Sequence, residues 1–311
     1  MSNKKTVSIC IPAYNEEHNM DNILKQVYSQ TQKEFVIEQV VVVSDGSTDN
    51  TVKIAQKYKN LGVKIIEGRV NRGQTCRQNE IIALTSSDIL VLLNADLLLG
   101  DNEVIARLID PILNGADLSA QWARPLPPHT FMERILYAGF ELKYFVYKHH
   151  KNGNNIYTCV GHMRALSRKF YSHVTFPKVS DGEDQYLYLA CIKGGYRYEY
   201  THASNVYFKL PDNFEDYKKY AVRIFQTQKK FGDVFSEELV RSERALPLDL
   251  RLRGCIYALL KYPFYTLPYI LLHIVMQRWA LIKPLNSSYT FDTAASTKNF
   301  AIANDFPNLT T

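Results

Sequence analysis

The chain has 311 residues, of which 46% are hydrophobic and 22% charged. This length and composition predict a globular protein with a sizeable core and exclude extended disorder. The net charge of +6 and the pI near 8.9 allow a nucleic-acid partner. However, the basic residues concentrate beside apolar, aromatic segments and no nucleic-acid motif is present, so we expect no such partner. Five singly scattered cysteines argue against a disulfide framework and favour cytosolic thiols.

Strand and helix signals alternate from the N-terminus onward. The polar residues 1–6 lead directly into the first expected strand and leave no room for a signal peptide, so we expect a domain that faces the cytoplasm. Strands are expected at 7–12, 37–44, 63–67, 88–94 and 117–122, and helices at 16–30, 50–59, 72–85 and 101–114. This alternation predicts an α/β fold with a mostly parallel sheet flanked by helices.

Polar residues stand where three of these strands end. The first strand stops at Pro12 and the second runs into a turn in which Gly46 permits a tight bend, while the unbroken apolar run 89–93 leads to Asn94-Ala95-Asp96. Ligands of open α/β sheets bind at the carboxyl ends of the strands. Mg²⁺ and Mn²⁺ keep waters and substrate phosphates, so Asp96 alone can anchor such an ion. The alternative is that these residues only terminate strands and form turns.

A second acidic element, Glu183-Asp184, opens a later helical stretch. Acids at a helix N-terminus are favoured by the helix dipole and by the unpaired backbone amides, which is one explanation of the pair. The other is that one of them accepts a proton. Between the two acidic elements, residues 128–150 are expected to form a long aromatic-rich helix that packs in the core or faces a membrane.

Taken together, the chain resembles the inverting family 2 glycosyltransferases of the GT-A fold. The resemblance covers roughly residues 6–230. The matching motifs are Ile11-Pro12-Ala13-Tyr14-Asn15-Glu16, Ser44-Asp45-Gly46-Ser47-Thr48-Asp49, Asn71-Arg72-Gly73, Asn94-Ala95-Asp96, Gly161 through Leu166, and Glu183-Asp184. The Gln-x-x-Arg-Trp element of processive members is absent, which favours a single sugar addition.

The resemblance implies a nucleotide-sugar site in the N-terminal half. The pocket would be lined by Pro12, Ala13, Tyr14 and Glu16, with Asp45 near the base or ribose, and with Asn94 and Asp96 beside the diphosphate. Asp96 would bind the Mg²⁺ or Mn²⁺ cofactor. Asn94 departs from the aspartate that the family often has, so the affinity and choice of cation are open. Arg72 is either a phosphate contact or a solvated loop arginine.

The resemblance also implies an acceptor side. Asp184 corresponds to the catalytic base, and Glu183 would orient the acceptor or its loop. Gly161 would let the chain approach the sugar closely, while His162 and Arg164 contact donor or acceptor, or lie on the surface. His202 is a further candidate ligand of the metal or a phosphate; the alternative is an ordinary histidine at a strand end.

The segment 255–276 is apolar and aromatic, is interrupted by Pro263 and Pro268, and carries Lys261. We consider three arrangements: an interfacial or re-entrant hairpin, which we favour, a bilayer span, and a buried helical pair that packs on the enzyme or on a second subunit. Arginines on both flanks suit an anionic leaflet. The polar residues beyond 284 are expected to be a weakly ordered tail.

These features predict three regions. Residues 1–232 form the catalytic domain, with a nucleotide-sugar half at 6–122 and an acceptor half at 123–232, followed by a membrane-associating region at 233–284 and a tail at 285–311. The predicted function is inverting transfer from a nucleotide-diphosphate sugar, UDP-linked in most relatives, to a lipid-linked or cell-envelope glycan at the cytoplasmic face of the membrane. The alternatives are transfer to a polyprenyl phosphate and a non-catalytic scaffolding subunit.

Overall fold

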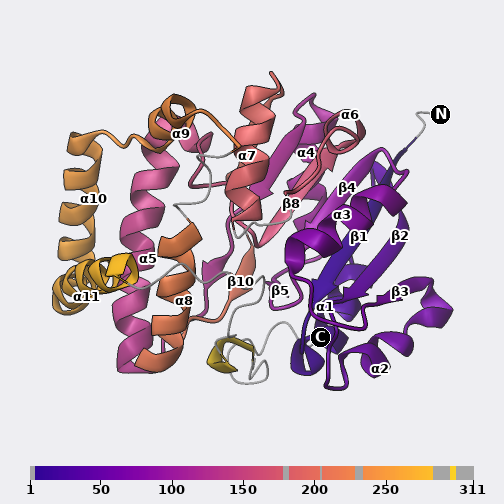
Figure 1. Cartoon of the computed structure of the whole chain (residues 1–311), viewed down its shortest axis with the longest axis horizontal. Coiled ribbons are helices and arrows are strands. Elements are labelled where there is room, and N and C mark those ends of the chain that lie inside the picture. Colours follow the sequence, from indigo (N-terminus) through magenta and orange to yellow (C-terminus); the bar gives the residue numbers. More distant parts are fainter. Residues whose placement is uncertain (1–3, 178–181, 204, 228–233, 283–294, 299–311) are drawn as a thin grey trace.

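The computed structural model describes residues 4–177, 182–203, 205–227, 234–282 and 295–298. Its centre is a seven-stranded sheet of order β3-β2-β1-β4-β8-β6-β9, covered by helices on both faces (Figure 1). The strands are β1 (Lys5–Ala13), β2 (Phe35–Ser44), β3 (Val63–Glu67), β4 (Ile89–Leu93), β6 (Leu118–Gln121), β8 (Met163–Ser167) and β9 (Tyr198–Thr201). The predicted α/β fold and its five predicted strands are confirmed, with ends that differ by a few residues.

One strand runs against the others. β1 pairs in parallel with β2 and β4, β2 pairs in parallel with β3, and β6 pairs in parallel with β9. β8 lies between β4 and β6 and is antiparallel to both. The segment that contains Gly161 and Arg164, identified by resemblance alone, therefore leads into a strand at the middle of the sheet.

The helices follow the predicted order. They are α1 (Glu17–Tyr28), α2 (Thr51–Gln56), α3 (Gln74–Leu84), α4 (Val104–Leu113), α5 (Phe131–His149), α6 (Arg168–Tyr171), α7 (Glu183–Lys193), α8 (Phe214–Thr227) and α9 (Glu237–Arg244), with short 3-10 turns η1 (Lys59–Leu61), η2 (His150–Gly153) and η3 (Ala295–Lys298). α2 is shorter than predicted, because the chain turns through η1 and a left-handed Gly62 into β3. α5 begins with a capping box in which Thr130 and Glu133 satisfy each other's backbone amides.

Two apolar layers cover the sheet, one on each face. Successive side chains of a strand point to opposite faces. Accordingly Val7, Ile9 and Ile11 of β1 join the layer under α1 and α4, whereas Cys10 joins the layer that contains Ile81 of α3 and residues of α7. The unbroken apolar sequence of β4 is explained by its position, because all five of its residues are buried.

A second sheet of three short strands holds the chain that follows β4. In it β10 (Val206–Phe208) pairs with both β5 (Leu98–Leu99) and β7 (Arg124–Pro125). The backbone amide of Gly100 also donates to the carbonyl of Asn205 at 2.7 Å. Residues just after Asp96 are thereby fixed to a segment more than a hundred positions later, which limits the freedom of the loop that carries this acid.

The C-terminal helices α10 (Leu248–Lys261) and α11 (Pro263–Ile282) form a pair that packs on α5, and α11 also packs on α8. The contact is close: a Cβ on Gly139 would lie 2.0 Å from the Tyr269 ring, and one on Gly254 would lie 2.4 Å from Val146 Cγ2. Figure 1 shows α5 and α8 between this pair and the main sheet. No helix within the described residues is long and apolar enough to cross a membrane.

Candidate active site

The residues predicted for the nucleotide gather where β1, β2 and β4 end. Pro12 and Ala13 close β1, and Tyr14 and Glu16 lie in the turn that leads to α1. β1 is the direct neighbour of both β2 and β4, and the three strands are parallel. The loop after β2 and the segment containing Asp96 therefore share one edge of the sheet with the first turn, as predicted from the strand ends.

The first two loops are fastened to each other by hydrogen bonds. Asn15 has a left-handed backbone (φ 53°), which asparagine tolerates better than most residues, and its Oδ1 accepts from the Thr48 amide at 2.8 Å. The amide of Glu16 donates to Thr51 Oγ1 at 2.7 Å. Gly46 has φ 75°, and a Cβ there would lie 2.7 Å from the backbone of the next loop. These contacts fix the backbone from which the Glu16 side chain extends.

The Asp45 carboxylate organises the third loop. It accepts hydrogen bonds from the backbone amides of Arg72 and Gly73 and from Arg77 Nε, each at 2.8 Å. Asp45 and Arg77 are both buried, and Arg77 also pairs with Glu80 at 2.9 Å. The Arg72 guanidinium is exposed and lies 3.3 Å from Glu80. Asp45 therefore fixes the loop that contains Arg72 and Gly73. Its contact with the base or ribose stays a prediction. The sequence did not indicate the role of Arg77, because its partner Asp45 lies 32 positions earlier in the chain.

Glu16 and Asp96 are near enough for their charges to interact. Glu16 is 8% exposed, and burial raises its pKa to about 7, with a further contribution from the charge of Asp96. Burial also raises the pKa of Asp96, while the positive charges of Lys298 and Arg223 oppose that rise. A divalent cation offsets the electrostatic repulsion between two buried carboxylates. The acids present therefore fit Mg²⁺ or Mn²⁺ at Asp96.

The second predicted metal ligand is His202, and Asn94 is predicted beside the diphosphate. His202 follows β9, the outermost strand, with β8 and β6 between β9 and β4, and its exposed side chain packs edge-on against Tyr200. The Asn94 side chain accepts from Gln74 Nε2 at 3.3 Å. Within the described ranges, no three His, Cys, Asp or Glu side chains are grouped to hold a metal ion. An ion at Asp96 would take most of its ligands from phosphates and water.

The second acidic element begins α7, as predicted. Gly182 precedes it with a left-handed backbone (φ 83°), and the Gln185 amide donates to Asp184 Oδ1 at 2.7 Å. Burial raises the pKa of Asp184 to about 6, and the charge of Glu183 adds to the rise, while Arg164 opposes it. A Cβ on Gly161 would lie 3.2 Å from Glu183 Oε1 and 3.8 Å from Asp184 Oδ2. Because glycine has no side chain, Glu183 and Asp184 can lie close to the backbone at position 161.

Arg164 is buried in the centre of the sheet, which corrects the alternative that it lies on the surface. It is 0% exposed and pairs across β8 with Leu92 of β4 and Ala120 of β6. Its Nη2 lies 3.6 Å from Glu183 Oε1, and none of its guanidinium nitrogens has a hydrogen-bond partner among the described residues. A buried guanidinium beside two acids favours their ionised forms.

His162 connects the two acidic elements through its backbone. Its carbonyl accepts from the Asn94 amide at 3.0 Å, while the backbone of Gly161 next to it hydrogen-bonds the Asp184 carboxyl. The imidazole packs on Phe208 at 4.8 Å, and burial, followed by the charge of Arg164, lowers its pKa to about 4. The short segment 161–164 therefore contacts both the loop that carries Asp96, the candidate metal ligand, and Asp184, the candidate base.

One further residue at this site had no sequence signal. The predicted tail at 285–311 contributes η3, in which Lys298 Nζ lies 2.8 Å from Glu16 Oε1. Residues 283–294 and 299–311, on which most of the predicted tail falls, lie outside the described residues. A lone lysine in a polar segment looks like any solvated lysine, so only the folded chain reveals its partner.

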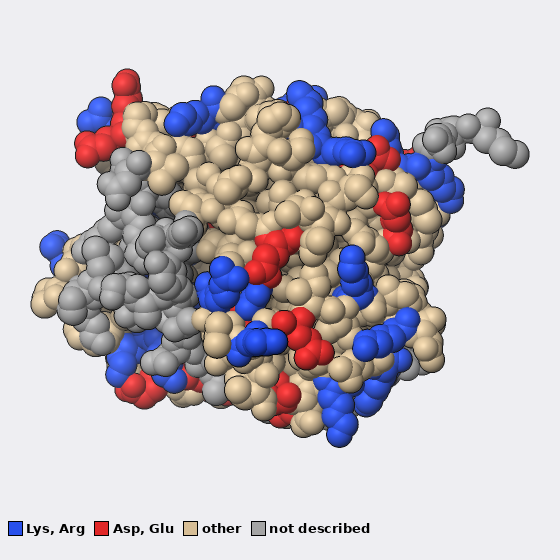
Figure 2. Space-filling model, turned by 45° about the vertical axis from the view of Figure 1, so that its right-hand side comes forward, with Lys and Arg blue, Asp and Glu red and all other residues tan. Residues whose placement is uncertain are grey.

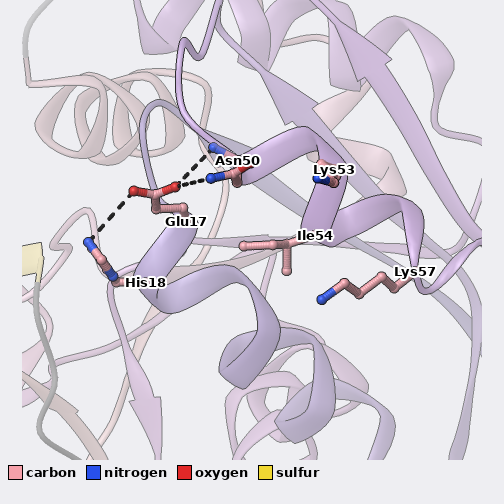
Figure 3. A pocket seen from close by; sticks show the side chains of 6 residues that line it. All are labelled: Glu17, His18, Asn50, Lys53, Ile54 and Lys57. Atoms are coloured by element: carbon pink, nitrogen blue, oxygen red, sulfur yellow. Dashed lines mark hydrogen bonds and ion pairs between the residues drawn. The ribbon is translucent and has the colours of Figure 1, made fainter.

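A surface hollow lies elsewhere, away from these residues. It measures 450 Å³ and lies between α1 and α2, lined by Glu17, His18, Asn50, Lys53, Ile54 and Lys57 (Figure 3). Glu17 Oε2 is already bound by the backbone and side chain of Asn50, at 3.0 and 2.8 Å. None of the lining residues is among the predicted ones, so we assign this hollow no role.

Charges of both signs are interspersed on the face seen in Figure 2, with wide uncharged areas between them. The net charge of +6 is therefore not gathered there into one continuous basic field. Nucleic-acid backbones are bound by clustered Lys and Arg. The expectation that nucleic acid is not a partner stays a prediction.

Solved structures of sugar transferases share this fold. A mannosyltransferase, PcManGT, from Pyrobaculum calidifontis in complex with GDP-Man and Mn²⁺ superposes with a TM-score of 0.60 at 19% identity, covering 99% of this chain and 89% of that one. Glucosyl-3-phosphoglycerate synthase from Mycobacterium tuberculosis with Mn²⁺, UDP and glucosyl-3-phosphoglycerate gives a TM-score of 0.52 at 16% identity, over 78% and 81%. At these identities the likeness shows the fold, and the predicted GT-A fold is confirmed.

Sequence relatives point the same way. The O-antigen chain rhamnosyltransferase RfbN of Salmonella typhimurium is 29% identical over 40% of this chain and 41% of that protein. The dolichol-phosphate mannosyltransferase of Pyrococcus furiosus is 32% identical over 36% of this chain and 32% of that protein. The matches thus span less than half of these relatives. The model of the family Glycosyl transferase family 2 matches residues 8–175, more than half of the chain. The chain therefore belongs to glycosyl transferase family 2.

Proposed function

We propose that this protein is an inverting, metal-dependent hexosyltransferase. It takes a sugar from a nucleotide-diphosphate donor, in the first instance a UDP-sugar, and transfers it to a hydroxyl of a lipid-linked or cell-envelope glycan. The observation that carries the proposal is the segment 161–164. It contacts the loop of Asp96 through the Asn94 amide, Asp184 through the backbone of Gly161, and Glu183 through Arg164 at 3.6 Å. A donor site and a base are thereby held next to each other.

On the donor side, we assign the base and ribose to the loops after β1 and β2, and the diphosphate to the end of β4. The residues assigned are Pro12, Ala13, Tyr14, Glu16, Asp45, Arg72, Asn94 and Asp96. Asp96 holds Mg²⁺ or Mn²⁺, and such an ion, when bound, stabilises the charge of the departing diphosphate. His202 is exposed at the far strand, so we assign the ion to Asp96 together with phosphates and water.

On the acceptor side, Asp184 is the general base. It removes the proton from the acceptor hydroxyl while that oxygen bonds to the anomeric carbon and the bond from this carbon to the diphosphate oxygen breaks. A pKa of about 6 leaves Asp184 mainly ionised at neutral pH and more basic than an ordinary carboxylate. Glu183 pairs with Arg164, so it orients the loop and the acceptor rather than taking the proton.

The outer face of α10 and α11 supports a membrane-bound acceptor. Large apolar side chains line this face at helical spacing and are exposed to solvent: Leu248, Leu252, Ile256, Leu260, Phe264, Leu267, Leu271 and Val275. The arginines at 251, 253 and 278 are also exposed. An apolar face with basic neighbours is the composition of a helix pair that lies in the interface of an anionic leaflet. We propose peripheral binding at the cytoplasmic face of the membrane.

A polyprenyl phosphate is the second candidate acceptor. The membrane-facing helices and the relative named as a dolichol-phosphate mannosyltransferase favour it. A phosphate oxygen is already anionic, so it needs little help from a base. Loss of the Asp184 carboxylate would then reduce turnover far less than it would with a hydroxyl acceptor.

The test is nucleotide release from a panel of UDP- and GDP-sugars with membrane lipid extract, with and without Mn²⁺ or Mg²⁺. The variants are Asp96→Ala and Asp184→Asn, and the control is Asp110→Asn, an exposed acid of α4. We expect metal-dependent turnover of one donor, lost in both site variants and kept in the control. Donor binding without turnover in any lipid extract would instead indicate the non-catalytic scaffolding subunit.

A further inference from the structure

The turn η3 lies on the loop between β1 and α1. Lys298 Nζ donates to the carbonyls of Tyr14 and Asn15, at 2.6 and 3.0 Å, and lies 2.8 Å from Glu16 Oε1. An ammonium group has three hydrogens and no more, so these three oxygens use all of them. In Figure 1 η3 is the yellow turn between α8 and α1. A C-terminal side chain is thus bound to the part of the chain assigned to the nucleotide.

The same turn is anchored a second time on α8. The backbone amide of Ser296 donates to Asp216 Oδ2 at 2.9 Å, and the Asp212 amide lies 3.5 Å from Ser296 Oγ. Burial acts to raise the pKa of Asp216, but hydrogen bonds from Ser296, Lys219 and Asn213 outweigh it and hold the pKa at about 2. We call residues 295–298 the strap, because they join α8 of the acceptor half to the first loop of the nucleotide half.

The atoms around Lys298 Nζ are the kind that bind hard cations. Two carbonyl oxygens and one carboxylate oxygen form a set that suits Mg²⁺ or Mn²⁺ as well as an ammonium. The Lys298 side chain is 16% exposed, and its charge also acts on Asp96. A divalent ion at Asp96 would be repelled by an ammonium so close to it. The protein therefore holds a cation of its own beside the place assigned to the metal.

We propose that the strap is an intramolecular competitor of the donor: Lys298 pairs with Glu16 and the carbonyls of Tyr14 and Asn15, and leaves them when the metal-bound nucleotide diphosphate binds. This inference rests on the proposed donor site at Asp96. In the strapped state all three hydrogens of Lys298 point to the protein, so none is available to a phosphate. Releasing the strap therefore costs part of the donor's binding free energy, and a protein that lacks Lys298 binds the donor more tightly.

Trypsin reports the state of the strap directly. Beyond Arg278 the chain has two basic residues, Lys283 and Lys298, and Lys283 precedes a proline, which blocks trypsin. Mass spectrometry follows cleavage after Lys298 as the loss of residues 299–311. The rate of this cleavage therefore measures how often the Lys298 side chain leaves the oxygens of Tyr14, Asn15 and Glu16. We expect slow cleavage of the full chain alone and roughly tenfold faster cleavage with saturating Mn²⁺ and UDP. Unchanged or slower cleavage with bound Mn²⁺ and UDP would refute the strap.

Two variants test the same idea by calorimetry and proteolysis. Lys298→Met should bind UDP with Mn²⁺ several-fold, up to about tenfold, more tightly than wild type. The matched control is Lys283→Met, which removes the same charge from the same part of the chain. Ser296→Pro removes the amide that binds Asp216 and should speed cleavage after Lys298 without any ligand.

The failures of the two proposals differ. If neither wild type nor Lys298→Met binds UDP or GDP with Mn²⁺, the donor site itself is wrong. If both bind equally tightly while Lys283→Met matches them, the donor site stands and the strap does not compete. If Lys298→Met binds more weakly, Lys298 is a contact of the bound diphosphate, and the proposed competition is refuted.

Discussion

Replacing the candidate base with its amide should stabilise the protein while it stops the reaction. The folded protein holds the Asp184 pKa at about 6 instead of 3.8, mainly because the side chain is buried. The unfolded chain therefore ionises Asp184 more easily than the folded one. The difference of about two pH units corresponds to roughly 3 kcal/mol of folding free energy lost at pH 7 to 8. Asp184→Asn cannot ionise, and its Oδ1 can still accept from the Gln185 amide, but its NH2 group cannot accept the hydrogen bond that the Gly161 backbone gives to Asp184, which offsets part of the gain.

The sign of the effect sets the pH range of the experiment. A raised carboxyl pKa costs almost nothing below about pH 3, where both states bind the proton, and its full cost appears above about pH 7. Urea unfolding followed by circular dichroism should therefore find Asp184→Asn more stable than wild type, by up to about 3 kcal/mol at pH 8 and by about half as much at pH 5. Asp110→Asn, at an exposed position, should show neither gain. An Asp184→Asn protein that is no more stable than wild type at pH 8, or a gain that is the same at both pH values, would refute this reasoning.

The other predictions concern the base, its surroundings and the membrane face. Activity (kcat/KM) should fall below about pH 6 as Asp184 takes up a proton, and Arg164→Met, which removes an opposing positive charge, should move this fall to higher pH in a pH-rate profile. A pH profile that does not move would show that Arg164 does not act on the base. Gly161→Ala brings a methyl group 3.2 Å from Glu183 Oε1, so turnover should drop while the thermal midpoint changes little; equal loss of both would mean a folding defect. Leu260→Glu with Phe264→Glu replaces side chains that are 81% and 82% exposed, so it should weaken sedimentation with anionic vesicles at least about tenfold and leave donor binding intact. Vesicle binding that survives the double change would place the membrane contact elsewhere.

Much of the proposed donor side follows from local sequence. The aliphatic run of β4 and the Asp96 that ends it can be located because a strand buried on both faces has no polar alternation. The turn at Gly46 was also predictable, since a tight bend with positive φ needs glycine. These features depend on neighbours in the chain, and the five predicted strands were correct for the same reason.

The acceptor side and the strap depend on contacts that no local pattern encodes. Arg164 looks like a surface residue in sequence, yet it is buried because β8 inserts between β4 and β6. Lys298 meets Glu16 across more than 280 positions. The interaction of Glu16 with Asp96 likewise arises only when β1 and β4 pair. Such long-range pairs set the pKa values at the site, so the motifs located the acids but not their chemistry.

The central antiparallel strand β8 also determines whether the chain can be divided into fragments that fold separately. β6 belongs to the nucleotide half by sequence, but both of its partners, β8 and β9, come from residues beyond 160. A ribosome that has made only residues 1–122 has produced an apolar β4 with one open edge and a β6 with no strand beside it. Open apolar edges are sites of aggregation. We therefore expect the two predicted halves to fold as one cooperative unit, and an excised N-terminal half to be insoluble where the intact chain folds.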